Sequence, residues 1–560
     1  MKLKAGKIVS VLLCFVLLFS SLVPVASAAG VGSSGGTGDS IFSGIKDVAS
    51  LDDFNANAEK VFYNVLNRAV ERLAKFICFL YPDPPTWVKE RDYNFEGFMA
   101  GRADYQTAPA ANSFWSLGYA SRSLVPADVA SGKYYLGRDL LNKKAQGVYD
   151  DQRIRVAVID DNSGEGAVVI AAIDGMGVTS TDIRAIREKV LASVFGIASI
   201  NIMSTHTHSA LDTQGVSTEF FYKLFTNGSY NFFRTQNKSE KLSVANYFKT
   251  YFIEQSAAAI CEAVGNMQSG RLYYSTVDVS EYVKDKRDLI SKEDIPEAAV
   301  LRFIPDSGNG DTFITDISCH PTSFSASNGL VSADYIYYMD KYIKEQCGGN
   351  LVLFQGALGQ LSRDNCGVDT TGMDEYTAKG AETKNLGEKF AALILAGDYS
   401  QELQPVLNAK HKSVWLKAEN SILKLACEVG LVNNQVVYRD LFTAEIASEV
   451  GYLEFGAKVG FALFPGELYP EVFWGDEITG GVNWDGTEWE YDSLYNSVSG
   501  KEVHCVSLAN DATGYVLTDN NFAFMGHIIG DGIADEILSA GKHMGSFLVE
   551  SFLGLVSELA

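Results

Sequence analysis

From about residue 95 onward, short apolar runs alternate with helical stripes, and this alternation constrains the fold of the chain most strongly. Short apolar runs are typical of buried strands, whereas apolar residues three or four positions apart indicate helices. The strand-type runs lie at 155–159, 168–173, 298–304, 313–317 and 351–354. The helical stripes comprise Ile183, Ile186, Val190, Val194 and Phe195, then 335–343, and finally Met544, Phe547, Leu548, Phe552, Leu555 and Leu559. The pattern predicts an α/β (α+β) domain in which a mixed sheet is flanked by helices.

Residues 411–464 depart from this alternation. They have the pattern of several consecutive strands, without an obvious helix between them. Strands that follow one another directly pair most easily in the antiparallel sense. We therefore expect part of the sheet to be antiparallel.

The N-terminal residues have the layout of a secretory signal. Lys2, Lys4 and Lys7 precede an apolar run at 8–22, and the small residues Ala26-Ser27-Ala28 follow it. This layout predicts a signal peptide over 1–28, cleaved after Ala28, and hence a secreted or cell-surface protein. An uncleaved membrane anchor is the alternative interpretation of the same run.

Three further segments follow the predicted signal. Residues 29–40 are a Gly/Ser-rich linker, and 41–94 carry apolar residues near helical spacing, which predicts a helical N-terminal extension. A proline-rich stretch at 81–85 ends this helical pattern, since proline breaks helices. The main domain is then expected over 95–560.

Charge and cysteine content exclude some classes of protein. The net charge of −23 repels phosphate backbones, so we expect no nucleic-acid partner. The eight cysteines include no CxxC pair, which argues against a zinc ribbon. Cys347 and Cys366 are the closest pair and either form a disulfide or remain free thiols.

Histidine is scarce, and three of the seven histidines occur at two predicted strand ends. His206 and His208 are two positions apart, so on a strand both imidazoles point to the same face. His320 follows the apolar run at 313–317. Ligands collect at strand ends of α/β sheets, and imidazole is a common zinc ligand. Hydrogen-bonded structural histidines are the alternative, but the two places together favour a metal site.

A catalytic metal also needs oxygen ligands, and Glu467 is a candidate. It follows the strand-like run at 459–464 within Pro465-Gly466-Glu467, where a glycine can turn the chain. The same residues would also suit the first turn of a helix, which favours an acidic side chain.

Taken together, segments from about residue 95 to the end resemble the neutral (or alkaline) non-lysosomal ceramidases, as a divergent, bacterial-type member. These are zinc-dependent amidases that cleave the N-acyl bond of ceramide. The motifs that carry the resemblance, in the family's order, are Gly101-Arg102-Ala103-Asp104, Gly118-Tyr119-Ala120, Asp174-Gly175-Met176-Gly177, Thr205-His206-Thr207-His208-Ser209, His320-Pro321-Thr322-Ser323 with Leu330-Val331-Ser332-Ala333-Asp334, Pro465-Gly466-Glu467, and Leu508-Ala509-Asn510 with Gly514-Tyr515.

The resemblance implies specific site residues. Zinc would be held by His206, His320, Glu467 and Tyr515. The further catalytic residues that it implies are His208 beside the metal as a proton donor to the leaving amine, Arg287 as an oxyanion-stabilising group, and Ser362, which aligns with a serine assigned as nucleophile in the family. A metal-activated water is the alternative nucleophile.

The chain departs from the family at several positions. The family's Gly-Asp-Val-Ser-Pro-Asn is replaced by Gly359-Gln360-Leu361-Ser362-Arg363-Asp364, which weakens the case for Ser362. A family tyrosine thought to polarise the substrate carbonyl is replaced by His527 in an ungapped count. The family's C-terminal immunoglobulin-like domain is not expected here, because the resemblance ends with the catalytic domain.

The resemblance thus predicts a zinc-dependent amidohydrolase that acts on ceramide or a related N-acyl lipid, with peripheral membrane contact. The alternatives are a zinc esterase or amidase on a non-lipid substrate, and a catalytically degenerate cell-surface binding protein. Two aromatic-rich segments, at 220–233 and 484–495, are expected either to line an acyl channel or simply to pack onto the domain.

Overall fold

The computed structural model describes residues 68–69, 72–73, 88–137, 143–218, 243–287, 290–324, 329–428, 431–440, 443–475, 487–523 and 535–559. The predicted signal peptide, the linker and most of the predicted helical extension lie outside these residues. Within the described part of the chain, no helix combines the length and apolar character needed to cross a bilayer.

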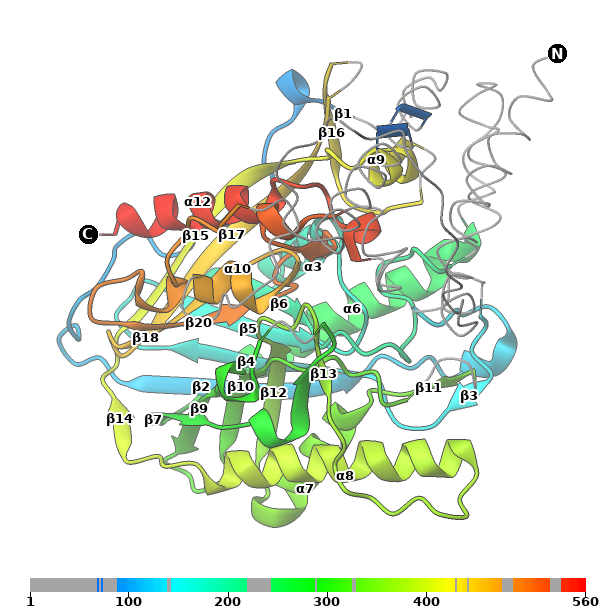
Figure 1. Ribbon diagram of the computed structural model, residues 1–560. Helices are drawn as coiled ribbons and strands as arrows, with labels where there is room; N and C mark the ends of the chain where they lie inside the picture. The colour runs from blue at the N-terminus through cyan, green and yellow to red at the C-terminus, as the bar shows by residue number, and fades with distance from the viewer. Residues whose placement is uncertain are drawn as a thin grey trace, which may run out of the picture.

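Two sheets packed face to face form the centre of the domain, as Figure 1 shows. The larger sheet has the order β12-β10-β9-β7-β2-β4-β5-β6, and β14 pairs with β7. The smaller sheet has the order β1-β16-β17-β18-β20, and β15 pairs with β17. The strands of the larger sheet are β2 (Trp115–Ser123), β4 (Arg153–Asp160), β5 (Ala167–Ile173), β6 (Ile197–Ser204), β7 (Gln268–Val277), β9 (Ala298–Pro305), β10 (Thr312–Ile317), β12 (Asn350–Gln355) and β14 (Gln401–Leu403).

The smaller sheet is largely antiparallel, which confirms the prediction made from the run of strands at 411–464. Its strands are β1 (Val88–Lys89), β15 (Leu407–Lys417), β16 (Val436–Asp440), β17 (Thr443–Phe455), β18 (Val459–Leu463) and β20 (Glu502–Val506). Short pairs join β3 (Gly147–Val148) to β11 (Leu330–Val331), β8 (Val283–Asp285) to β13 (Leu361–Arg363), and β19 (Glu467–Leu468) to β21 (Tyr515–Val516).

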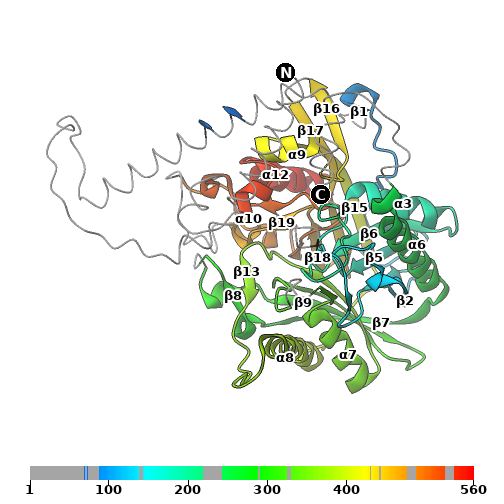
Figure 2. The ribbon, with the colours of Figure 1, turned by 90° about the vertical axis from the view of Figure 1, so that its right-hand side faces the viewer.

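Helices cover the outer face of each sheet, so the domain has four layers, as the two perpendicular views show (Figure 2). The larger sheet carries α3 (Ser180–Leu191), α6 (Ser243–Gly265), α7 (Tyr335–Cys347) and α8 (Glu375–Ala396), and the smaller sheet carries α10 (Pro470–Trp474) and α12 (Met544–Ser557). Alternate strand residues face the helices and the second sheet. For example, Val156 packs with the helices, whereas Ala157 packs between the sheets. The predicted mixed sheet flanked by helices is thereby confirmed.

Three details differ from the sequence-based expectations. The helical stripe that begins at Ile183 ends at Leu191, and Phe195 is 92% exposed, because Gly196 follows with a φ of 77° and turns the chain toward β6. Within 411–464 a helix, α9 (Ser421–Glu428), interrupts the strands, since Asn420 accepts hydrogen bonds from two backbone N–H groups at its start.

The third difference concerns the predicted helical extension. Its last described residues, 88–94, contain strand β1, which pairs in parallel with β16. Glu90 forms an ion pair with Arg439 just beyond this pairing, at 2.8 Å. This end of the segment therefore belongs to the smaller sheet.

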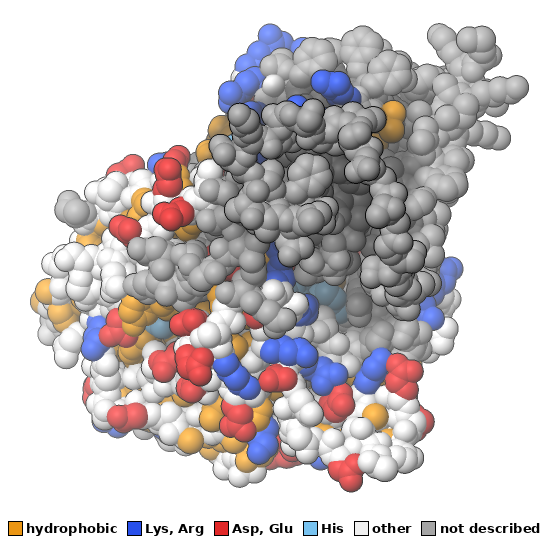
Figure 3. Space-filling view, in the orientation of Figure 1, with side chains coloured by type: hydrophobic (Ala, Val, Ile, Leu, Met, Phe, Trp, Pro, Cys, Tyr) orange, Lys and Arg blue, Asp and Glu red, His pale blue; other side chains and the backbone are white. Residues whose placement is uncertain are grey.

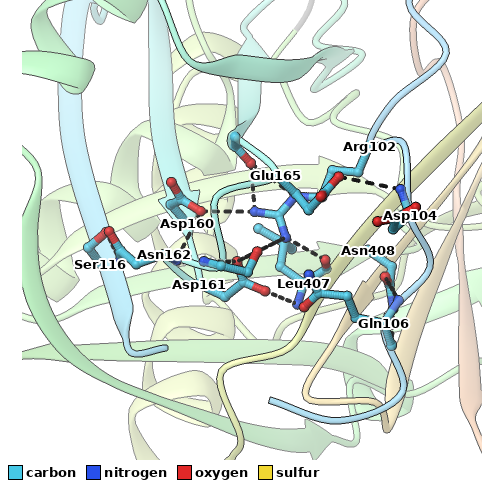
Figure 4. A network of polar contacts seen from close by, with 12 residues as sticks. Arg102, Asp104, Gln106, Ser116, Asp160, Asp161, Asn162, Glu165, Leu407 and Asn408 are labelled. Atoms are coloured by element: carbon cyan, nitrogen blue, oxygen red, sulfur yellow. Dashed lines mark hydrogen bonds and ion pairs between the residues drawn. The ribbon is translucent and has the colours of Figure 1, made fainter. Parts of the chain in front are cut away.

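A buried arginine connects the two sheets near the start of the domain (Figure 4). Arg102 is fully buried and lies 2.9 Å from both Asp160 and Asp161 at the end of β4. It also donates hydrogen bonds to the carbonyls of Gly166 and Leu407. Each charge of this network is paired, as burial requires. Arg102 of the Gly101-Arg102-Ala103-Asp104 motif therefore has a structural role.

The structure also describes the closest pair of cysteines and the distribution of charge on one face. Cys347 and Cys366 are free thiols, so of the two alternatives for this pair the structure has the unbridged one. On the face shown in Figure 3, acidic and basic side chains are interspersed over the described surface.

Candidate metal centre

His206 stands at a turn directly after β6. Its backbone has a φ of 64°, a left-handed conformation that is uncommon and strained for a residue with a side chain. Its Nδ1–H donates to the carbonyl oxygen of Met176, at 2.6 Å, in the segment that follows β5. Because a carbonyl can only accept, this hydrogen bond leaves Nε2 as the unprotonated nitrogen.

His320 is held in the same way after β10. Its Nδ1–H donates to the carbonyl oxygen of Leu361, at 2.8 Å, and its backbone N–H donates to the same carbonyl. Nε2 of His320 is therefore also the unprotonated nitrogen. A backbone carbonyl bound to the second ring nitrogen is the usual arrangement of a metal-ligating histidine.

Glu467 and Tyr515 lie side by side on the short parallel strands β19 and β21, where they are paired residues. Glu467 thus begins a strand, and the alternative of a helical first turn is wrong; helix α10 starts three residues later, at Pro470. The Tyr515 ring stacks against His320 with a centroid distance of 6.4 Å. The four residues implied as ligands are therefore brought together from four separate segments.

The ligand atoms converge on one point. Nε2 of His206 lies 3.0 Å from Oε2 of Glu467, and Nε2 of His320 lies 3.5 Å from the same oxygen. Within the described residues, none of these three buried atoms makes a hydrogen bond of good geometry. Lone pairs that face one another in a buried place are unfavourable unless a cation lies among them. The donor set therefore fits a metal ion.

The protonation states also suit a metal. Burial, followed by the nearby Lys286 charge, lowers the pKa of His320 to about 4, so its imidazole is neutral at pH 7. Burial acts to raise the pKa of Glu467, but His206 and His320 lower it well below its usual range. Metal ligands must be neutral imidazoles and ionised carboxylates, and these residues meet that requirement.

His208 is the third imidazole of the group. Its ring centroid lies 4.8 Å from that of His206 and 5.8 Å from that of His320. The candidate ligand atoms of the three histidines all lie within 4.8 Å of one another. The two rings of the His-x-His pair thus lie together, although β6 ends at Ser204 and neither histidine is on a strand as predicted. His208 lies close enough to bind a metal or to exchange a proton beside it.

Arg287 and Ser362 border this centre in different ways. Nη1 of Arg287 donates to the hydroxyl of Tyr469 at 3.1 Å, and its guanidinium also lies 3.7 Å from Glu536. The Tyr469 ring in turn lies 6.1 Å from that of Tyr515. Ser362 is bridged by its backbone to His320. Ser362 therefore lies next to His320, whereas Arg287 lies behind Tyr469 with its charge engaged by neighbouring protein groups.

The other expected residues either fall outside the described residues or pack onto other parts of the domain. His527 is outside the described residues, as are residues 220–233 and Trp484. Trp489 and Tyr491 pack against α12, where the Tyr491 hydroxyl donates to Glu550, and Tyr495 stacks on Trp474. The second aromatic segment therefore packs onto the domain as far as it is described, which is the second of the two alternatives for it.

Three of the remaining histidines have structural partners. His411 contacts the Ser199 hydroxyl at 2.8 Å, His504 contacts the Tyr274 hydroxyl at 2.7 Å, and exposed His543 pairs with Glu419 at 2.9 Å. None of them joins the group at His206. This supports the prediction that the metal site lies at His206, His208 and His320 and not at these other histidines.

Sequence reasoning missed several residues that shape the centre. Gln355 ends β12 and makes hydrogen bonds beside two of the histidines. Tyr469 receives the Arg287 hydrogen bond and donates to Asp535. A polar residue directly after a buried strand run, such as Gln355 after 351–354, is the one sequence signal that could have indicated such a role.

Comparisons with known proteins show the fold. No protein-family model and no curated protein matches the sequence. The neutral ceramidase from Pseudomonas aeruginosa matches with a TM-score of 0.58 and 15% identity, over 80% of this chain and 75% of that chain. A ceramidase complexed with C2 matches with a TM-score of 0.56 and 14% identity, over the same shares. The chain therefore has a ceramidase-like fold.

Proposed function

We propose that this chain is a zinc-dependent amidohydrolase that cleaves the N-acyl amide bond of ceramide or a related N-acyl lipid, giving a fatty acid and an amine. The observation that carries the proposal is the convergence of His206, His320 and Glu467 on one buried point, with Tyr515 beside them. The ceramidase-like fold supports the amide substrate.

The spacing of the ligand atoms is compatible with zinc. Two ligands held about 2.0–2.1 Å from a tetrahedral zinc ion lie roughly 3.3 Å apart. The two distances from the histidine nitrogens to the Glu467 oxygen, 3.0 and 3.5 Å, bracket this value. Burial, followed by the Glu467 charge, raises the pKa of the Tyr515 phenol, and a cation nearby would favour its ionised form instead.

When bound, zinc supplies a Lewis acid and a water whose pKa is lowered to about 7. The chain's own residues then orient the substrate and move protons. His208 is placed to give a proton to the leaving amine, because its ring lies next to two ligands. Arg287, whose guanidinium lies over the Tyr469 ring, is the residue that we propose stabilises the oxyanion.

The nucleophile can be tested at Ser362. We expect Ser362→Ala to retain substantial activity, because a water activated at the metal needs no serine, and because the family motif around Ser362 is degenerate. Steady-state kinetics with an N-acyl substrate measure the effect. An inactive Ser362→Ala variant, together with an acylated Ser362 in the wild type by mass spectrometry, would instead assign the serine as nucleophile.

The lipid character of the substrate can be tested with a series of N-acyl chain lengths at a fixed head group. Catalytic efficiency should rise from short to long chains, by up to roughly fourfold for each methylene that becomes buried, since each contributes about 0.8 kcal/mol. Phe220→Ala or Phe221→Ala, in the first aromatic segment, should flatten that rise. A flat profile in the wild type would favour the alternative of a non-lipid amidase or esterase.

The remaining predictions from the sequence form part of the same proposal. We infer a secreted or cell-surface enzyme, from the predicted signal peptide over 1–28, that meets its lipid substrate by peripheral contact with a membrane. The degenerate binding protein is the second alternative. It is disfavoured by the complete set of ligand residues and by their convergence in the structure.

A further inference from the structure

Three segments that carry the metal-binding side chains meet at a single buried glutamine. Gln355 is the last residue of β12 and is completely buried. Its side-chain amide and its backbone carbonyl make hydrogen bonds in three directions. We propose that Gln355 is the positioning residue that sets the mutual distances of the metal ligands, an inference that rests on the zinc site proposed above.

The side chain of Gln355 connects the two histidine segments. Its Nε2 donates to the carbonyl of Thr205, at 2.9 Å, directly before His206. Its Oε1 accepts from the backbone N–H of Cys319, at 3.3 Å, directly before His320. One planar amide, with a donor on one side and an acceptor on the other, thus fixes two ligand-bearing strand ends relative to each other.

The backbone of Gln355 connects the glutamate segment. Its carbonyl accepts from the N–H of Ser507, at 2.9 Å. The Ser507 hydroxyl oxygen accepts from the N–H of Leu468, at 3.2 Å, directly after Glu467. The position of the carboxylate is therefore tied to the same residue as the positions of the two imidazoles.

Tyr335 reinforces this arrangement from helix α7. Its hydroxyl donates to the carbonyl of Cys319, at 2.7 Å, and accepts from Nε2 of Gln355, at 3.1 Å. Tyr335 is also completely buried. Fully satisfied polar networks of this kind hold a buried site in one geometry, and groups behind metal ligands are typically worth about 10- to 100-fold in metal affinity.

The test compares Gln355→Met with Asn408→Leu in the full chain. Asn408 is a matched control, because it is also a completely buried amide that both accepts from and donates to a backbone segment, at Gln106, but on β15 away from the metal centre. Both variants lose buried hydrogen bonds, so both should lose stability. Only Gln355→Met should lose zinc affinity, by about 10- to 100-fold, and only it should alter the visible spectrum of the bound cobalt(II) form.

Zinc affinity is measured by competition with a chromophoric chelator after the metal has been stripped. Equal affinities for wild type and Gln355→Met, or equal losses in both variants, would overturn the inference while the zinc site stood. A wild-type protein that binds no zinc would overturn both the inference about Gln355 and the proposed zinc site. If Gln355→Met does not fold, Tyr335→Phe replaces it, with an expected loss of about two- to tenfold from the two hydrogen bonds removed; unchanged affinity would then contradict the inference.

Discussion

Replacing His206 or His320 with alanine should abolish zinc binding and lower kcat/KM for an N-acyl substrate by roughly a thousandfold or more. Both Nε2 atoms face the Glu467 carboxylate, so either loss leaves too few ligands to hold the ion. Metal catalysis contributes several kcal/mol of transition-state stabilisation, and each 1.36 kcal/mol corresponds to a tenfold change in rate. Steady-state kinetics on the purified variants measure the loss.

His411→Gln is the matched control for these variants. His411 is a buried imidazole like His206 and His320, but it contacts Ser199 rather than the metal centre. Burial lowers its pKa to about 4, so it is also neutral at pH 7. This variant should keep its zinc and its activity even if it is less stable. Equal activity in His206→Ala and in the wild type would contradict the assignment of His206.

Replacing Arg102 with leucine should have the largest effect on stability, a loss of about 3–5 kcal/mol in the free energy of unfolding. That is the typical cost when one partner of a buried ion pair is removed and the other charge stays behind. In the wild type the carboxylates of Asp160 and Asp161 each lie 2.9 Å from Arg102. In the variant both carboxylates would remain without this cation. Whole proteins are stable by only about 5–15 kcal/mol. Urea denaturation followed by circular dichroism measures the change.

An exposed ion pair provides the control for this prediction. Arg122 lies 2.8 Å from Glu262, but the two side chains are 40% and 44% exposed. Such pairs contribute about 0–1 kcal/mol because water screens them. Arg122→Leu should therefore shift the unfolding transition little. The account of the Arg102 network would be wrong if both variants lost the same stability.

The sequence predicted the fold where its patterns are local. The strand runs at 155–159 and 168–173 correspond to β4 and β5, because short apolar runs report directly which segments are buried strands. The sequence-based prediction was wrong at Phe195, which was placed in a helix, and at α9, which was not predicted. A glycine turn and an asparagine cap decide the local structure there. Such signals are short and compete with the apolar pattern.

The candidate site was only partly predictable, for a different reason. The spacing of His206 and His208 predicted that their rings lie together, and the structure shows this, but a turn after the end of β6 brings them together, not the predicted strand alternation. Tyr515 came only from the resemblance, and the residues around Glu467 left a metal ligand and a helix start as alternatives, because the pairing of Glu467 with Tyr515 depends on β19 and β21 meeting across a long sequence separation. Gln355 was missed altogether, since its partners are backbone atoms, which no pattern of side chains reveals.

The zinc content of the purified full chain, determined by elemental analysis, tests the central claim most directly. The wild type should contain about one zinc per chain, lose its hydrolytic activity when a strong chelator removes the metal, and recover it when zinc is restored. Zinc in His206→Ala and in His320→Ala should fall to background, whereas His411→Gln should retain it. A wild type with no zinc and chelator-resistant hydrolysis, or both centre variants with full zinc occupancy, would contradict the account.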